Sequence, residues 1–344
     1  MKVVAAFDKF RGSATALELT AAVDRAARSL GWACDPIPLA DGGEGLLEVF
    51  GGSNRRAVVT GPLGDPVDAG WRADGSRAVI EMAEASGIAL VGGAEGNDAL
   101  SATSAGTGEL IAEAIGAGAR RVIVGVGGSA CTDGGLGAMR AMEPLARISA
   151  ATIEVACDVR LRFLDAATRF GPQKGASPAQ VQLLERRLER LAQVYFDQFG
   201  IDVASMDGSG AAGGLAGGLA AVGARLSSGF DLVADEVGLE DRIAGADLVI
   251  TGEGLVDDQS LDGKVVGGVL EMADELGIDA LVICGAVDDG DWPRGLLDGV
   301  EVISLSGRFG LGEAMASVVG LVETIATEVL SDRSIAADFP PERL

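Results

Sequence analysis

The spacing of hydrophobic positions predicts strands that alternate with helices at both ends of the chain. An apolar run over 2–7 predicts a first strand, and the helix that follows it begins with Thr15 and Glu18 as a capping box. A second strand is expected over 34–39. Toward the other end, strands are expected over 246–250, 281–284 and 300–305, and a final helix over 313–330. Such alternation is typical of a parallel sheet covered by helices.

The middle of the chain has a different pattern. Between residues 55 and 82, short apolar runs separated by turn residues predict antiparallel strands. Further strands are expected over 122–124 and 153–157, and Ser177, Pro178 and Gln180 mark the start of a long helix.

We therefore predict a two-domain α/β fold. A three-layer parallel-sheet domain of the Rossmann or flavodoxin type should contain residues 1–50 and 230–335. It should be interrupted by a second α/β domain, residues 51–229, with antiparallel strands and glycine-rich loops. Residues 336–344 are expected to form a tail, with disorder beginning near Ser331.

The stretch 121–138 carries the strongest candidate chemistry. A buried strand there breaks into glycines that surround Ser129, Thr132 and Asp133. Ligands bind at the carboxyl ends of parallel strands, and glycine lets the backbone approach them closely, so this pattern predicts an anion site with an acid beside it. Two other interpretations stay open: a tight turn without a ligand, and a dinucleotide site, because 125–130 fits GxGxxA.

Other strand ends and glycine clusters add candidates. Asp41 and Asp158 each follow a predicted strand, although an acid in that position is often only a helix cap. Gly106 and Thr107 lie where a helix is expected to begin, which suits either an anion or simple capping. The glycine cluster 208–214 fits close helix packing as well as it fits ligand contact.

Composition narrows the chemistry. The chain has no histidine, which excludes Ser-His-Asp and Cys-His catalysis, and its four cysteines are too scattered for zinc or a disulfide framework. The net charge of −24 argues against nucleic-acid and anionic-membrane partners, but not against a small anionic ligand. Without a signal-like or spanning segment, we expect a cytoplasmic protein that acts on a small molecule; the sequence makes no prediction of its oligomeric state.

Several motifs in order carry a family resemblance. They are DKFRGS (8–13), ADGGEG (40–45), VIEMAEASG (79–87), SAGTGEL (104–110), VGVGGSACTDGG (124–135), EVACDV (154–159), FGPQKGA (170–176), GSGAAGGL (208–215) and VITGEGLVDDQSLDGK (249–264). With these motifs the chain resembles the type 1 bacterial glycerate kinases from residue 1 to about residue 330. The resemblance implies ATP- and Mg²⁺-dependent phosphorylation of D-glycerate to phosphoglycerate, with the 2-phosphate as the expected product.

The resemblance and the residue types together give a division of labour. Asp133 is the first choice for the general base and Asp41 the second, while Lys174 and Lys264 neutralise phosphate charge. Glu253 and Asp257 are expected to hold Mg²⁺. The residues expected to bind substrate or phosphate are Gly127, Gly128, Ser129, Gly106, Thr107, Arg11, Glu44 and Asp158.

The chain also differs from the family pattern. It carries Lys9, Arg11, Ala105 and Leu255 where the family has Ser, Lys, an aromatic residue and Arg, and its segment 138–152 is short. Two alternatives follow: a diverged relative with another hydroxy-acid substrate, and a non-catalytic homologue that binds a small acid or nucleotide. A nicotinamide oxidoreductase based on the GxGxxA match is a third.

Overall fold

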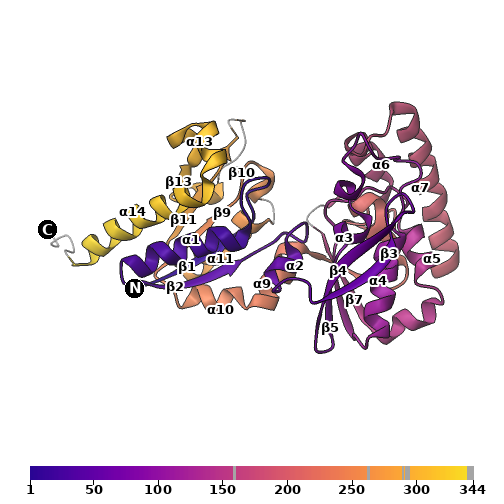
Figure 1. The fold of residues 1–344 in the computed structure, drawn as a ribbon, viewed down its shortest axis with the longest axis horizontal. Coiled ribbons are helices and arrows are strands. Elements are labelled where there is room, and N and C mark those ends of the chain that lie inside the picture. Colours follow the sequence, from indigo (N-terminus) through magenta and orange to yellow (C-terminus); the bar gives the residue numbers. More distant parts are fainter. Residues whose placement is uncertain (158–159, 262–263, 289, 291–294, 339–344) are drawn as a thin grey trace. The chain divides into compact units, whose positions relative to one another are not determined.

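The computed structural model describes residues 1–157, 160–261, 264–288, 290 and 295–338 (Figure 1). The chain forms two compact units: unit 1 contains residues 1–40 and 230–344, and unit 2 contains residues 41–229. The first boundary falls after Ala40 rather than near residue 50, because the loop that follows packs within unit 2. No helix in the described part of the chain has both the length and the apolar character needed to cross a membrane.

Unit 1 is built on a parallel five-stranded sheet. Its strand order is β13-β11-β9-β1-β2, and every neighbouring pair is parallel. The strands are β1 (Lys2–Phe7), β2 (Ala33–Pro38), β9 (Leu248–Gly252), β11 (Ala280–Cys284) and β13 (Glu301–Ser304). Because β1 pairs with β9, strands from the two ends of the chain share one sheet, as the sequence predicts.

Helices cover both faces of this sheet, which gives the predicted three layers. Leu281 and Ile283 of β11 pack with helices α1 (Ala16–Ser29) and α14 (Val318–Asp338) on one face. Val282 and Cys284 point to the other face and pack with α11 (Val265–Leu276). The remaining elements of unit 1 are α9 (Gly229–Val237, whose first residue belongs to unit 2), α10 (Leu239–Ala244), α12 (Leu305–Phe309), α13 (Leu311–Ala316), the short parallel pair β10 (Leu255–Val256) and β12 (Ala286–Val287), and the 3-10 turns 259–261 and 295–297.

Unit 2 is built on a mixed six-stranded sheet of order β3-β4-β5-β6-β7-β8. The first three strands are antiparallel, and the pairs from β5 to β8 are parallel. The strands are β3 (Arg55–Thr60), β4 (Pro66–Asp74), β5 (Arg77–Glu81), β6 (Arg121–Gly125), β7 (Thr152–Cys157) and β8 (Arg225–Ser228). The predicted antiparallel strands between residues 55 and 82 are therefore present.

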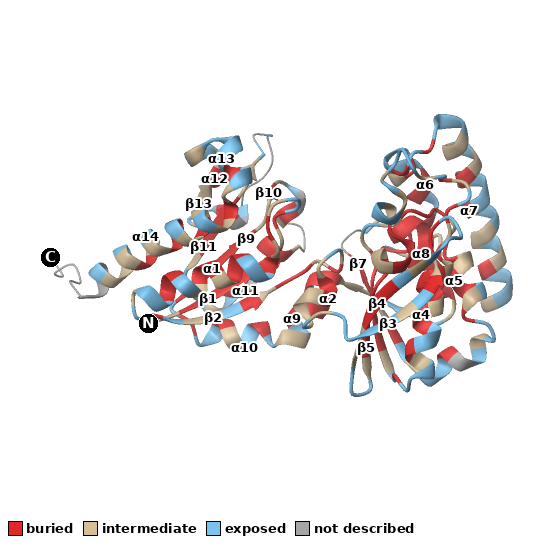
Figure 2. Ribbon diagram, viewed as in Figure 1, coloured by how far each residue is buried: buried red, intermediate tan, exposed pale blue. Residues whose placement is uncertain are grey.

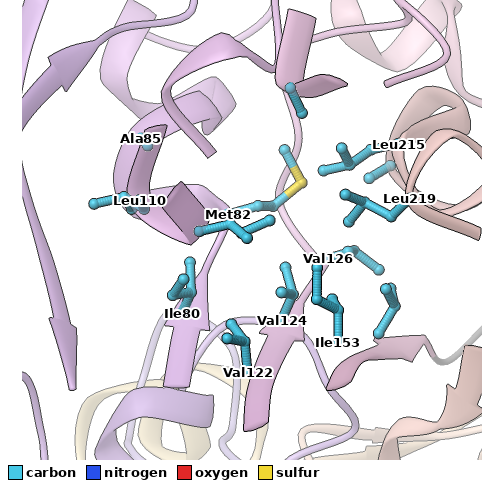
Figure 3. Packing of buried hydrophobic residues seen from close by; sticks show 14 of the residues in the cluster. Ile80, Met82, Ala85, Leu110, Val122, Val124, Val126, Ile153, Leu215 and Leu219 are labelled. Carbon is cyan, nitrogen blue, oxygen red and sulfur yellow. The ribbon is translucent and has the colours of Figure 1, made fainter. Parts of the chain in front are cut away.

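The main core of unit 2 lies between this sheet and its helices. Figure 3 shows Ile80, Val122 and Val124 of the sheet facing Leu110 and Leu215 of two helices, and Figure 2 shows the buried strands and helix faces in red. The helices are α2 (Leu46–Val49), α3 (Ala83–Ser86), α4 (Ala105–Gly116), α5 (Leu136–Ala141), α6 (Ala166–Phe170), α7 (Pro178–Phe199) and α8 (Leu215–Ala221), with 3-10 turns at 88–91, 145–150, 163–165, 172–174 and 211–214.

The carboxyl-terminal segment differs from the prediction in two ways. The single helix expected over 313–330 is broken at Ser317 into α13 and α14. The expected disorder from Ser331 is wrong for the residues up to Asp338, which continue α14. Ser334 accepts a hydrogen bond from the Trp32 indole, and Arg333 pairs with Asp279, so this end of the helix is tied to unit 1. The rest of the predicted tail, 339–344, lies outside the described residues.

Candidate active site

Two glycine-rich loops meet at the carboxyl ends of β6 and β7 in unit 2. A Cβ atom on Gly42 would lie 2.8 Å from the Ala156 carbonyl oxygen, and one on Gly125 would lie 2.7 Å from the Gly42 carbonyl oxygen. A Cβ on Gly127 would lie 2.5 Å from the Cα of Gly43. Because only glycine allows these approaches, the loop Asp41–Gly45 is seated directly on the strand ends.

This packing places Asp41 and Glu44 on a loop that touches the central glycine stretch. The Oδ1 atom of Asp41 accepts a hydrogen bond from the Gly43 amide at 3.1 Å, and the Asp41 side chain is half-buried. Glu44 is exposed. The structure thus brings together two of the predicted acids, Asp41 and Glu44, with Gly127.

Gly127, Gly128 and Ser129 form an accessible edge of this region. All three are at least partly exposed, and Gly128 has a left-handed φ of 71°. The flanking bonds run from the Ile88 amide to the Gly128 carbonyl and from the Ala130 amide to the Ser86 carbonyl. Within the described part of the chain, no acceptor is found for the amides of 127–129, a property that suits an anion.

Asp133 lies in a different setting. Its carboxylate accepts hydrogen bonds from the Ser104 amide and hydroxyl, both at 2.9 Å, and from the amides of Gly135 at 3.0 Å and Gly137 at 3.1 Å. These donors tie the glycine loop to the start of α4 and occupy both carboxylate oxygens. The contacts explain Asp133 as a brace of the loop; its role as general base stays a prediction.

Lys174 is buried behind the same loop. Its ammonium donates to the Cys131 carbonyl at 2.5 Å, and its side chain lies close enough to Asp133 for an electrostatic attraction. Burial lowers the Lys174 pKa below its ordinary value, because a buried ammonium loses hydration. The structure therefore brings Lys174 and Asp133 together, with Lys174 facing the interior of unit 2.

Gly106 and Thr107 lie in the first turn of α4, as the sequence predicts. A Cβ on Gly106 would collide with the Thr60 carbonyl, and Thr107 is fully buried with its hydroxyl 2.9 Å from that of Ser86. These contacts account for both residues by packing, and their predicted contact with a ligand is untested. Asp158, another predicted binding residue, lies outside the described residues.

Glu81 is an acid at the strand ends that the sequence analysis did not select. It is the last residue of β5, it is buried, and its Oε1 accepts a hydrogen bond from the Leu47 amide at 2.6 Å. Burial, together with the charges of Glu84 and Glu44, raises the Glu81 pKa to about 7. The sequence signal that could have identified Glu81 is a charged residue that directly follows the apolar run 78–80.

Unit 1 carries a second cluster of predicted residues around Glu253. Burial raises the Glu253 pKa to about 7, with Asp8 and Asp257 acting in the same direction and Ser260 and Lys264 opposing them. The Oε1 atom of Glu253 is buried and has no hydrogen-bond partner among the described residues.

Asp257 and Lys264 are held by the segment that follows Glu253. Asp257 forms a tight turn in which its Oδ1 accepts hydrogen bonds from the Ser260 amide and hydroxyl, both at 3.0 Å. Lys264 is the residue that precedes α11. The structure therefore brings Glu253, Asp257 and Lys264 into one neighbourhood.

The first loop of unit 1 lies beside this cluster. The backbone of Arg11 approaches Gly254, and the Arg11 side chain is exposed. Lys9 pairs with Asp8 at 3.4 Å, with both side chains largely buried. The lysine that departs from the family pattern is thus used in a local ion pair.

The donor set around Glu253 fits a magnesium ion that is bound mainly through a substrate. Among the described residues there is no cluster of three or more side chains that could hold a metal by themselves. Mg²⁺ usually takes one or two carboxylates and completes its shell with phosphate oxygens and water. The unpartnered Oε1 atom of Glu253, with the Asp257 carboxylate nearby, meets that smaller requirement.

The structure bears on two alternatives from the sequence, the role of the glycine cluster 208–214 and the dinucleotide site at 125–130. The cluster 208–214 is tightly packed, since a Cβ on Gly210 would collide with the Arg162 carbonyl and one on Gly213 with the Cys131 carbonyl. After Gly125 the chain runs as a loop until α5 begins at Leu136, so the GxGxxA match lacks the helix that a dinucleotide site needs.

The family model and the similar proteins all point to the same family. The model of the glycerate kinase family matches residues 3–145 and 142–333, and the two stretches meet within the short segment 138–152. A glycerate 2-kinase of Escherichia coli (strain K12) is 39% identical over 331 residues, covering 84% of this chain and 86% of the relative. A glycerate kinase of Bacillus subtilis (strain 168) is 38% identical over 327 residues, covering 83% and 85%.

The fold has a solved counterpart. The crystal structure of a protein named glycerate kinase 2 from Salmonella typhimurium LT2 matches with a TM-score of 0.80 and 34% identity. The match covers 97% of this chain and 99% of that chain.

Proposed function

Because this chain belongs to the glycerate kinase family, we propose that it transfers the terminal phosphoryl group of ATP to the 2-hydroxyl of D-glycerate. The observation that carries the proposal is that the family match extends from residue 3 to residue 333 and includes every candidate loop. The relatives named glycerate kinase cover most of the chain at 38–39% identity.

In unit 2 we assign substrate binding and proton removal to the two loops at the strand ends. The amides of Gly127, Gly128 and Ser129 offer donors to an anionic group such as a carboxylate or a phosphate. Asp41 takes the proton of the attacking hydroxyl, because its carboxylate is half-buried on a loop held next to these amides. We place Asp41 ahead of Asp133, because the two carboxylate oxygens of Asp133 already accept hydrogen bonds from Ser104 at the start of α4 and from Gly135 of the glycine loop.

In unit 1 we assign the handling of nucleotide charge to the Glu253 neighbourhood. Glu253 and Asp257 would hold Mg²⁺, which neutralises phosphate charge when it is bound. Lys264 and the exposed Arg11 would contact phosphate oxygens directly. Phosphoryl transfer depends mainly on positioning and charge neutralisation, so these few residues are a sufficient set.

The test is a coupled assay of the purified protein with ATP, Mg²⁺ and D-glycerate, with L-glycerate and other small hydroxy acids in parallel. We expect ADP release with D-glycerate and a product that enolase consumes without a mutase, which identifies the 2-phosphate. ADP release only with another hydroxy acid would favour a diverged substrate, an alternative raised by Leu255, which is 50% exposed where the family pattern has Arg. No ADP release with any acceptor would overturn the proposal and favour a binding protein.

A further inference from the structure

Glu81 is a buried acid to which the proposed function assigns no role. Its side chain is 7% exposed, and its carboxyl group accepts hydrogen bonds from the backbone amides of Leu47, at 2.6 Å, and Gly45. Both amides lie where the loop Asp41–Gly45 ends and α2 begins. Glu81 therefore grips the carboxyl end of that loop.

The other end of the loop is held by the strand beside Glu81. Glu81 of β5 is in register with Gly125 of β6, and Gly125 leaves the space that the Gly42 carbonyl fills. The loop is thus held at Gly42 by close backbone packing and at Gly45 by a carboxylate. Between these two points lies Gly43, whose backbone abuts Gly127 and whose amide holds the Asp41 carboxylate.

A carboxylate is a costly way to hold a loop at this position. The side chain is removed from water, and Glu44 and Glu84 add negative charge nearby. The loops at Gly210 and Gly213, also in unit 2, are held by glycine packing and backbone hydrogen bonds. A group that is costly to bury but defines a fixed geometry is typical of functional sites.

We propose that Glu81 is a positioning residue for the phosphoryl transfer: by accepting the amides of Gly45 and Leu47, it fixes the Asp41–Gly45 loop, and with it the Asp41 carboxylate, against Gly127. The inference rests on the proposed function, in which Asp41 removes the hydroxyl proton. Glu81 itself touches no reacting atom in this scheme.

Hydrogen exchange tests the contact without any substrate. Glu81→Met removes both acceptors at similar length, and Glu81→Gln keeps one. Glu109→Met is the matched control, because Glu109 also holds backbone in unit 2, accepting from the Thr60 amide at 2.8 Å. A hydrogen bond to a charged group is worth enough that we expect amides in 41–52 to exchange at least about tenfold faster in Glu81→Met. Amides near Thr60 should respond only to Glu109→Met.

Kinetics test the consequence for the reaction. In Glu81→Met we expect kcat with glycerate to fall by at least about tenfold while the KM for ATP changes little, because the base is misplaced and nucleotide binding is not. Glu81→Gln should recover part of the rate, and Glu109→Met should keep kcat close to that of the wild type.

The outcomes separate the two proposals. Equal exchange in the loop of Glu81→Met and the wild type, or full kcat in Glu81→Met, would overturn the role of Glu81. A wild-type protein that is inactive with glycerate would overturn the proposed function, and the exchange pattern would then decide on its own whether Glu81 fixes the loop.

Discussion

The ammonium of Lys174 donates a hydrogen bond to the backbone carbonyl of Cys131, 43 residues earlier in the chain. The bond fastens the glycine loop from behind, since Lys174 is only 5% exposed and the amide side chain of Asn97 joins the carbonyls of Lys174 and Ala130. The contact explains Lys174 as part of the support of the loop. Its direct contact with phosphate stays a prediction.

Lys174 should give the protein a stability that rises with pH in the alkaline range. Because burial lowers its pKa in the folded state below 10.5, the unfolded chain holds this proton to higher pH, and the native state gains stability as pH rises between the two values. We expect the free energy of unfolding of the wild type, relative to Lys174→Met, to increase as pH rises toward the ordinary lysine value of 10.5. Urea titrations of both proteins measure it. A constant difference would mean that Lys174 is not buried as an ammonium.

Asp133→Asn should mainly lower the stability of the protein, whereas Asp41→Asn should mainly lower kcat. Asp133→Asn replaces a charged acceptor of several bonds, so we expect the free energy of unfolding to fall by about 2 kcal/mol. Asp41→Asn should change stability by less than about 1 kcal/mol and lower kcat by about 10²–10⁴-fold, the usual contribution of a general base. Denaturant unfolding and steady-state kinetics of both variants check this. Full kcat in Asp41→Asn, with the loss appearing in Asp133→Asn at unchanged stability, would return the base to Asp133.

Gly127→Ala should damage the contact between the two loops of unit 2. Its new Cβ would lie 2.5 Å from the Cα of Gly43, so the backbone must shift, at a cost of about 1–3 kcal/mol. Gly116→Ala is the matched control. It lies at the end of α4 with nothing within 4 Å of its Cβ position, and should stabilise the protein by about 0.5 kcal/mol. Thermal unfolding of the two variants gives the comparison, and equal stabilities would contradict the close approach.

Glu253→Gln should weaken the response to Mg²⁺. The substitution keeps the size of the side chain but removes the charge from the unpartnered Oε1 position. We expect the Mg²⁺ concentration for half-maximal rate to rise by about tenfold or more, as for the loss of one metal ligand or its support. Magnesium titrations at saturating ATP measure it, with Glu275→Gln on α11 as a charge-matched control. Unchanged Mg²⁺ dependence would remove Glu253 from the metal site.

Glu81 should give a stability that falls as pH rises through the weakly acidic range. Its pKa of about 7 in the folded protein lies above the ordinary 4.5, so the native state holds a proton that the unfolded chain has lost. The stability from that proton is complete below pH 4.5 and is lost as pH approaches 7. The wild type should therefore lose stability relative to Glu81→Gln across this window in urea titrations, whereas parallel curves would exclude the raised pKa.

Local signals were sufficient for most of the fold. Thr15 and Glu18 form the predicted capping box at the start of α1, and Ser177 and Gln180 form the one at the start of α7. A buried strand is visible in the sequence as an uninterrupted apolar run, and β1 accordingly begins and ends at the predicted residues. These features depend on near neighbours in the chain, which a sequence displays directly.

Long-range packing was not visible in the same way. Nothing near Gly106 shows that its Cα lies against Thr60, and nothing near Lys174 shows that its ammonium turns inward toward Cys131. Both residues have types suited to phosphate binding, and tertiary contacts account for them otherwise. Glu81 was missed for the converse reason: it stands alone in an apolar run, and its partners, Gly45 and Leu47, belong to another segment.

The sheet order of unit 1 sets the order in which the chain can fold as it is synthesised. β1 is made first, yet its partner β9 emerges from the ribosome only after all of unit 2. A Cβ on Gly229 would collide with the Asp41 carbonyl, so the first and last residues of unit 2 lie together and its six strands need nothing made later. Unit 2 can therefore fold while β1 of the nascent chain still lacks its partner β9, and the parallel sheet of unit 1 closes last.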